Sequence, residues 1–194
     1  MTNKYVYRPR SSWVYFGILA AIELSVIIGF AVAGRSQETI ISLINSAAAD
    51  ILCYIFVVKP KLVLSGEQID IVNPFQKISI GWHRAIDFDT RFAFKVETNE
   101  GTFSAWAATA PGRYSTRRIH ESDFRGTGLE SRKVISPSAA PGAESGVAMI
   151  LSLKRKSEAL NAGSALDHLT KSYDWLALAI TITSAAVLLY NLLH

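Results

Sequence analysis

Two acidic residues within long apolar runs carry the clearest chemistry in this sequence. Glu23 lies in the run from Trp13 to Gly34, and Asp50 lies in the run from Ile40 to Val58. Each is the one charged residue of its run. Acids inside membrane spans often mark proton or cation paths, and polar side chains in spans also hold neighbouring helices together.

The two acids are equally distant from the short link between the runs, near residues 36 and 37. In an antiparallel helical hairpin they therefore lie at the same depth, near the centre of a bilayer. Two ionised carboxylates in lipid are prohibitive, so we expect at least one to be protonated at neutral pH and the pair to titrate as a unit.

Two interpretations of the acid pair follow. The first is interhelical glue, with partners among other polar side chains of the apolar runs: Asn45, Ser46, Thr181, Thr183 and Ser184. The second is a proton or cation relay. The apolar runs contain no basic partner and no further acid that would extend a path, which favours glue.

Other catalytic or metal-binding constellations are missing from the sequence. His83, His120 and His168 have no metal-ligand spacing, and Ser104 and Ser115 lack a nucleophile-elbow context. The single Cys53 excludes a disulfide or zinc framework within one chain. We therefore expect a protein that is not an enzyme, with no metal and no cofactor.

The apolar runs predict three transmembrane helices, at 13–34, 40–58 and 175–193, because a bilayer needs about 20 apolar residues. The alternative for the first run is a cleaved signal peptide, with a basic start and a small-x-small site at Ala31-Val32-Ala33. Its length and the presence of Glu23 favour an uncleaved span.

Basic residues predict the orientation. Lys and Arg flank the outer sides of the hairpin and precede the third run, which places the N-terminus and the central region in the cytoplasm of a multi-pass plasma-membrane protein. The net charge of +4 is small and belongs to these flanks. It predicts contact with anionic membrane lipids and no binding of nucleic acid.

The chain divides into five predicted segments: an N-terminal tail with the helical hairpin (1–58), a β domain (59–112), a flexible Arg-, Ser- and Pro-rich segment (113–144), a helical segment (145–170) and a C-terminal span (173–194). The helix of the fourth segment is expected at Ser145–Leu160. Alternation in the β domain predicts short strands around Leu62, Ile69 and Ile78, one regular strand over 86–96, a turn at 99–101 and a returning strand over 102–108. Trp106 is expected in the core.

Six basic residues are candidate contacts for lipid or a protein partner: Arg113, Arg117, Arg118, Lys154, Arg155 and Lys156. The alternative is that the three arginines belong to a solvated loop whose charges only follow the positive-inside bias.

The order of several short motifs resembles a known family. YRPR at 7–10, KPKL at 59–62, VNPF at 72–75, Trp82, TRF at 90–92 and AWAATAPGR at 105–113 are similar to actinobacterial membrane proteins with a bacterial pleckstrin-homology (PH) domain, related to the low molecular weight protein antigen 6 family. The likeness runs from Tyr7 to Arg113 and continues more weakly over 120–127 and 145–153. Thr109 replaces the family's usual proline, and Lys77 stands in the turn after Asn73-Pro74.

The resemblance implies a fold and a class of function. It implies a cytoplasmic PH-like antiparallel β-barrel or half-barrel capped by a helix, joined to three transmembrane helices. Its motif residues are expected to be structural: Pro74, Trp82, Trp106, Pro111, Gly112 and Arg113. Such a domain would bind a protein partner, self-associate or bind the membrane surface. The alternative is a small oligomeric proton- or cation-linked component that uses Glu23 and Asp50.

Overall fold

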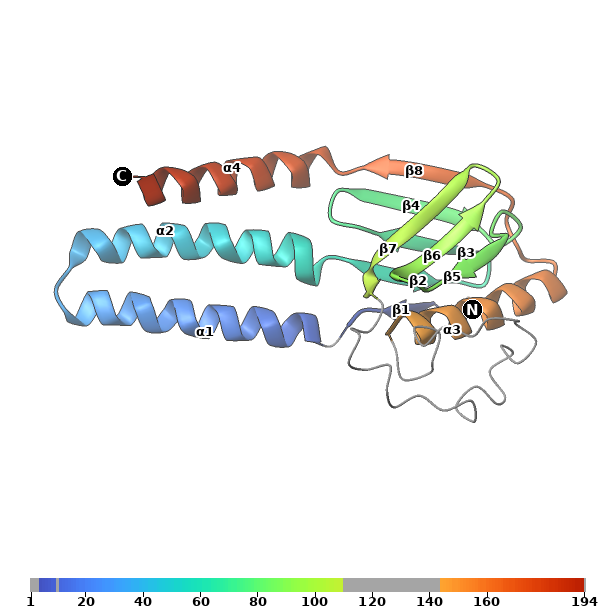
Figure 1. Cartoon of the computed structure of the whole chain (residues 1–194), viewed down its shortest axis with the longest axis horizontal. Coiled ribbons are helices and arrows are strands. Elements are labelled where there is room, and N and C mark those ends of the chain that lie inside the picture. The colour runs from blue at the N-terminus through green and yellow to red at the C-terminus, as the bar shows by residue number, and fades with distance from the viewer. Residues whose placement is uncertain (1–3, 10, 110–143, 194) are drawn as a thin grey trace. The chain divides into compact units, whose positions relative to one another are not determined.

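The computed structural model describes residues 4–9, 11–109 and 144–193 (Figure 1). The chain forms two compact units. The β unit takes residues 1–9 and 60–173, and the helical unit takes residues 10–59 and 174–194. The predicted flexible segment lies outside the described residues over 113–143.

The helical unit consists of α1 (Ser11–Val32), α2 (Ser36–Cys53) with the π-helical turn η1 (Tyr54–Val58), and α4 (Trp175–Leu193). Helices suit these apolar runs because a helix satisfies its own backbone hydrogen bonds, which lipid cannot do. α1, α2 with η1, and α4 are all long and apolar enough to cross a membrane. This confirms the three predicted apolar helices, although α2 begins four residues earlier than expected, at Ser36 and not at residue 40.

A glycine turn reverses α1 into α2. Gly34 adopts a φ of 71°, which a residue without Cβ reaches at little cost. The Arg35 N–H donates to the Phe30 carbonyl oxygen at 3.0 Å, and the Gly34 N–H donates to Ala31 at 3.1 Å. These two bonds form the Schellman pattern that commonly ends a helix. Within the unit, α2 contacts both α1 and α4.

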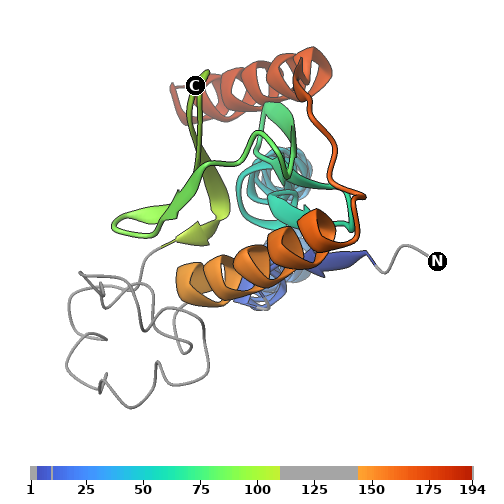
Figure 2. The same ribbon diagram turned by 90° about the vertical axis from the view of Figure 1, so that its right-hand side faces the viewer.

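The described strands of the β unit form two antiparallel sheets (Figures 1 and 2). The first has five strands in the order β1 (Tyr5–Tyr7), β2 (Lys61–Leu64), β3 (Gln68–Val72), β4 (Gln76–Gly81) and β8 (Leu169–Tyr173). The second has β5 (Asp87–Asp89), β6 (Ala93–Thr98) and β7 (Gly101–Thr109). Leucines and isoleucines alternate inward on β2, β3 and β4 and are fully or almost fully buried, as the period-two pattern predicted.

The helix α3 (Glu144–Asn161) completes the core by contacting β2, β6 and β7 (Figure 2). Ala148 and Met149 of α3 belong to the same buried cluster as Trp82, Phe88 and Phe94. The rings of Phe88 and Phe94 stack with their centroids 5.7 Å apart. The structure therefore confirms a mostly antiparallel β fold with a packed helix after it.

The prediction of one strand over 86–96 is wrong, because a turn divides this stretch into β5 and β6. The Arg91 N–H donates to Asp89 Oδ1 at 3.1 Å, an Asx turn that reverses the chain. Phe92 in the turn is 80% exposed, and Ile86 before β5 is 54% exposed. Only Phe88, Phe94 and Val96 of the expected apolar face, together with Thr90, are buried.

The helix expected at Ser145–Leu160 is α3, which runs from Glu144 to Asn161, and the rest of the 145–170 segment is not helical. Gly163, with a φ of 65°, follows the helix, and the Ser164 N–H donates to Ala159 at 3.0 Å. The chain then enters β8, which pairs with β4. Gly81 on β4 permits this approach, because a Cβ there would lie 2.1 Å from the Leu166 carbonyl oxygen.

The N-terminal segment also differs from the prediction. Tyr5–Tyr7 was expected to belong to a tail, but it forms the edge strand β1 against β2, with Tyr7 opposite Leu62. The first sheet thus includes strands that precede and strands that follow the helical hairpin in the sequence.

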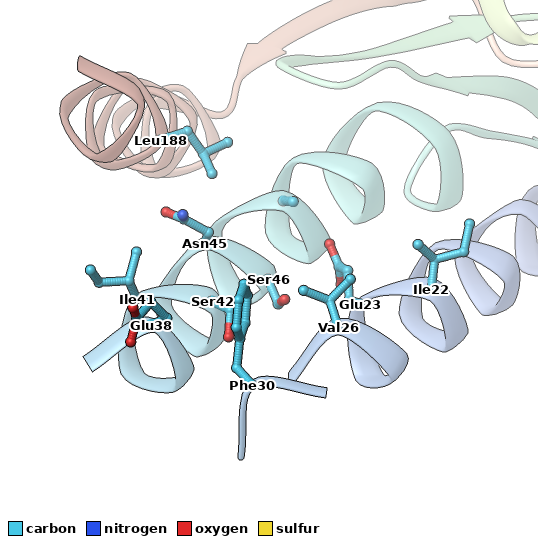
Figure 3. A pocket seen from close by; sticks show the side chains of 11 residues that line it. Ile22, Glu23, Val26, Phe30, Glu38, Ile41, Ser42, Asn45, Ser46 and Leu188 are labelled. Atoms are coloured by element: carbon cyan, nitrogen blue, oxygen red, sulfur yellow. The ribbon is translucent and has the colours of Figure 1, made fainter. Parts of the chain in front are cut away.

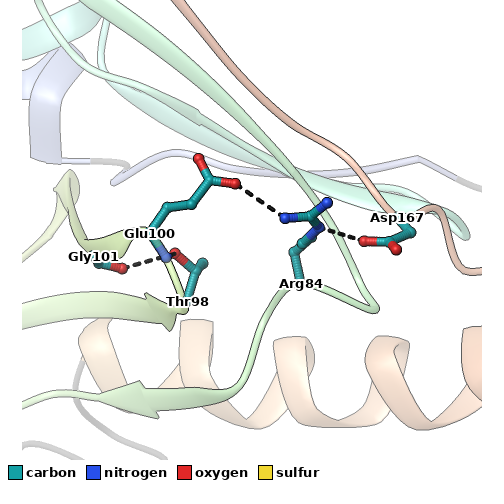
Figure 4. A network of polar contacts seen from close by, with 5 residues as sticks. All are labelled: Arg84, Thr98, Glu100, Gly101 and Asp167. Carbon is teal, nitrogen blue, oxygen red and sulfur yellow. Dashed lines mark hydrogen bonds and ion pairs between the residues drawn. The ribbon is translucent and has the colours of Figure 1, made fainter.

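An arginine joins three segments of the β unit (Figure 4). The Arg84 guanidinium, between β4 and β5, contacts Glu100 in the β6–β7 turn at 3.1 Å and also Asp167, which precedes β8. Thr98 supports the β6–β7 turn by donating from Oγ1 to the Gly101 carbonyl oxygen at 2.8 Å. The network holds the loop ends of both sheets together.

An asparagine joins the two sheets at another point. Asn73, in the turn between β3 and β4, donates from Nδ2 to the Ser104 carbonyl oxygen and accepts from the Trp106 N–H, each at 2.9 Å. Its amide therefore pairs with the backbone of β7 as a neighbouring strand would. Aspartate or alanine could not make both bonds.

We predict that Asn73→Ala destabilises the β unit by about 1–2 kcal/mol, because two solvent-accessible hydrogen bonds are lost. Chemical unfolding of the detergent-solubilised full chain measures the effect. Asn99→Ala, at an exposed position in the β6–β7 turn, is the matched control and should change little. Equal stability of the two variants would contradict the role assigned to Asn73.

Candidate functional site

The structure brings Glu23 of α1 and Asp50 of α2 together. Their carboxyl groups lie close enough to each other and to Cys53 to interact electrostatically. The position follows from the hairpin, since α1 and α2 run antiparallel from the turn at Gly34. Glu23 Oε2 and Asp50 Oδ1 are buried atoms without a hydrogen-bond partner in the described part of the chain.

Three of the five polar partners expected for the acids have other contacts. Asn191 Nδ2 of α4 donates to Asn45 Oδ1 of α2 at 2.7 Å. Thr181 and Thr183 donate to carbonyl oxygens of their own helix, at 2.8 and 3.0 Å. Within the described apolar helices, α2 therefore makes two interhelical polar contacts. A pair of acids joins it to α1, and a pair of amides joins it to α4.

A cavity of about 430 Å³ opens beside Glu23 (Figure 3). Its walls come from α1, α2 and α4, and its polar lining residues are Glu23, Glu38, Ser42, Asn45 and Ser46. Three of these side chains already have partners in the helical unit: Glu38 pairs with Arg35 at 2.7 Å, Ser42 donates to Thr39, and Asn45 accepts from Asn191.

The chemistry open to this site is limited by its groups. Two adjacent carboxyls can hold a shared proton, and a carboxylate can bind a small cation. Within the described residues, no group of three His, Cys, Asp or Glu side chains could hold a metal ion. Glu23 is the member of the acid pair that lines the cavity.

A second polar contact joins η1 to α4. Lys59 Nζ lies 2.7 Å from Asp174 Oδ2, while Asp174 Oδ1 accepts the Ala177 N–H at 2.9 Å and so caps α4. The hydrogen bond from Lys59 holds the pKa of Asp174 below its ordinary value, and the bond from Ala177 and the Lys59 charge act in the same direction. Sequence reasoning missed this pair, although an Asp directly before an apolar run is an N-cap signal.

The three predicted basic contacts on α3 do not form one patch. Lys156 Nζ donates to the Ala85 and Ile86 carbonyl oxygens and lies 5.9 Å from the centroid of the Phe88 ring. Burial lowers the pKa of Lys156, and the Asp87 carboxylate opposes that shift. Arg155 pairs with Glu158 at 3.3 Å, and Lys154 is exposed. Lys156 thus fastens α3 to the connection before β5.

The motif residues have different environments. Trp82 is fully buried and donates from Nε1 to the Ser65 carbonyl oxygen at 3.1 Å, and Pro74 is also buried. The expectation that Trp106 lies in the core is wrong, because its side chain is 55% exposed. Ala105 and Ala107 face inward on β7, so the alternation turns Trp106 outward. Pro111, Gly112, Arg113, Arg117 and Arg118 lie outside the described residues.

Comparison with protein-family models, curated proteins and solved structures finds no match to this chain.

We predict that acid weakens the link between Lys59 and Asp174. A carboxylate with a lowered pKa in the folded state stabilises the fold above its unfolded pKa, and this contribution disappears as the pH falls through the folded value. Wild-type protein should therefore lose its stability advantage over Asp174→Asn as the pH falls from 7 to 3. Asparagine keeps a helix cap but cannot titrate.

The expected difference is below about 1 kcal/mol, since the pair is accessible to solvent. Thermal unfolding of both full-length proteins in detergent at several pH values measures it. A difference between the two proteins that does not vary over this pH range would contradict the assignment.

Proposed function

We propose that this chain is a non-enzymatic integral membrane protein that displays a cytoplasmic PH-like domain for interaction with a protein partner or with a second copy. The three apolar helices support the membrane attachment. Two meanders of three consecutive strands, β2–β4 and β5–β7, followed by α3, support a PH-like half-barrel capped by a helix. The basic flanks of the apolar helices support the cytoplasmic orientation.

The observation that carries the proposal is the open edge of β8. Among the described strands, β8 is the last in its sheet and pairs only with β4. Thr170 to Tyr173 are exposed. An exposed strand edge offers unpaired backbone groups to an extended segment of another chain, and strand addition is a common mode of binding.

The register shows which backbone groups face outward. The Gly81 N–H donates to the His168 carbonyl oxygen at 2.8 Å, so His168 turns its backbone toward β4. Because the direction alternates along an antiparallel strand, Thr170 and Ser172 also face β4, whereas Lys171 presents its N–H on the open side. Lys171 Nζ lies 4.6 Å from the centroid of the Phe103 ring, so its side chain packs on the unit's own inner face.

We predict that Lys171→Pro abolishes partner capture, because proline removes an N–H from the open edge without removing one from the ladder to β4. The matched variant Lys171→Ala loses the same charge and the contact with Phe103 but keeps the N–H. Tagged full-length protein is crosslinked in membranes, solubilised and purified, and the captured proteins, including untagged copies of the chain, are quantified.

The expected result is about a tenfold or greater loss of capture for Lys171→Pro, with Lys171→Ala near wild type. Proline removes one hydrogen bond to the added strand, and its ring clashes with that strand. Equal capture by wild type and Lys171→Pro would exclude docking at this edge.

A second candidate function rests on the acid pair. Glu23 and Asp50 lie together, Glu23 lines a cavity, and one oxygen of each is buried without a described partner. Such an arrangement supports a small oligomeric component that moves protons or cations, because intramembrane acids often mark these paths.

Proton flux into vesicles that contain the full-length protein tests this candidate. If the acids carry protons, Glu23→Gln and Asp50→Asn should reduce the flux to that of protein-free vesicles while leaving assembly intact. Glu38→Gln, at a lining position already paired with Arg35, should keep most of it. Wild-type flux equal to that of protein-free vesicles would leave the acids as interhelical glue.

A further inference from the structure

The chain enters and leaves the β unit at one end of the five-stranded sheet. The register places Tyr7 opposite Leu62, Lys61 opposite Val72, and Gln76 opposite Tyr173. The end of β1, the start of β2 and the end of β8 therefore share one end of the sheet, together with the β3–β4 turn. We call this the tether end.

Only short connections lead from the tether end to the apolar helices. α1 begins at Ser11, η1 ends at Val58 and α4 begins at Trp175, so each connection has at most three residues. An extended residue spans at most about 3.6 Å. If the helices cross a bilayer, the tether end must then lie within roughly 15 Å of the places where the chain enters it.

The tether end has exposed aromatic side chains. Asn73, in the β3–β4 turn, binds the backbone on both sides of Ala105 and so holds Trp106 there. Tyr173 is 58% exposed at the end of β8. In the second sheet, Phe92 lies in the β5–β6 turn, at the end away from the turn that holds Glu100. Phe92, Tyr173 and Trp106 are the large aromatic side chains of the described β unit that are more than half exposed.

The tether end also has basic side chains on the outer face of the sheet. Lys61, Val72, Lys77 and Ser172 form one cross-strand row. Two strand spacings separate the lysines, so their Cα atoms lie about 10 Å apart. Asp70, in the next row, lies 3.7 Å from Lys77 Nζ and offsets part of its charge.

Acidic residues gather at the opposite end of the sheet. Gln68 opposite Gly81 marks that end. Glu67 precedes Gln68, and Asp167 with Glu100 surrounds Arg84 (Figure 4). The β unit is therefore basic and aromatic at the tether end and acidic at the opposite end of the sheet. Tyr and Trp prefer the membrane interface, and Lys is attracted to anionic lipids.

We propose that the tether end seats on anionic phospholipid headgroups, with Trp106 and Tyr173 in the headgroup layer and Lys61 and Lys77 against the phosphates. The exposure of Trp106 has a physical reason under this proposal, since the membrane interface covers its ring. The inference rests on the proposed membrane attachment but not on docking at β8.

A fluorescent label at residue 104 tests the seat in the full-length protein. In a Cys53→Ser background, Ser104→Cys is labelled next to Trp106, and Ser157→Cys on α3 serves as the control position. Each protein is placed in nanodiscs of phosphatidylcholine alone or with 30% phosphatidylglycerol. A small fraction of the lipid carries a nitroxide on its headgroup, which quenches nearby labels.

We expect the label at 104 to be quenched several-fold more in the anionic discs than the label at 157. Lys61→Gln and Lys77→Gln should each shift the ratio of seated to unseated protein by about fivefold, the effect of one lysine near an anionic surface. Lys154→Gln removes an exposed charge on α3 and should leave the quenching unchanged.

Two results would overturn the inference, and they are distinguishable. Equal quenching at 104 and 157 would overturn the seat alone. A label at Ile182→Cys, exposed on α4, reports on insertion, because a nitroxide on the lipid acyl chain quenches it only if α4 lies in the bilayer. If that label is not quenched, the proposed membrane attachment is wrong, and the proposed seat is wrong with it.

Discussion

The pairing of β1, β2 and β8 in one sheet is the constraint on which the rest of the structure depends. These three strands directly adjoin α1, η1 and α4 in the chain. Neither β1 nor β8 has enough apolar residues to fold alone, and each is stable only through its ladder to a neighbour. Forming the sheet therefore brings three chain segments to a common end before any contact between helices is considered.

Much of the β unit follows from its hydrophobic pattern, whereas its turns and edges do not. The alternating residues of β2, β3 and β4 identify their strands and their buried faces because one face packs on the core. The stretch over 86–96 also alternates, yet Asp89 closes an Asx turn that interrupts it. A short polar side chain such as Asp89 is a local signal for a turn. The alternation over 86–96 is longer and favours one continuous strand, so the two signals compete.

The elements and side chains that were wrongly predicted all depend on distant parts of the chain. β8 has the sequence LTKSY, whose apolar residues are too few to predict a strand. It forms because its backbone pairs with the edge of β4. Trp106 faces outward because Ala105 and Ala107 take the inner face of β7, and Asn73 fixes that position from a turn more than thirty residues away. In the helical unit, the proximity of Glu23 and Asp50 followed from simple counting because a tight hairpin leaves little freedom.

Polar contacts make α2 the organising helix of its unit. It shares an acid pair with α1 and an amide pair with α4, and the lysine that follows η1 holds the cap of α4. Polar pairs between apolar helices specify which faces meet, and these pairs define the geometry of the unit. A displacement of α1 or α4 along α2 would separate at least one of them. The cavity beside Glu23 is therefore bounded by helices that are fixed at other points: the acid pair joins α1 to α2, and the amide pair joins α4 to α2.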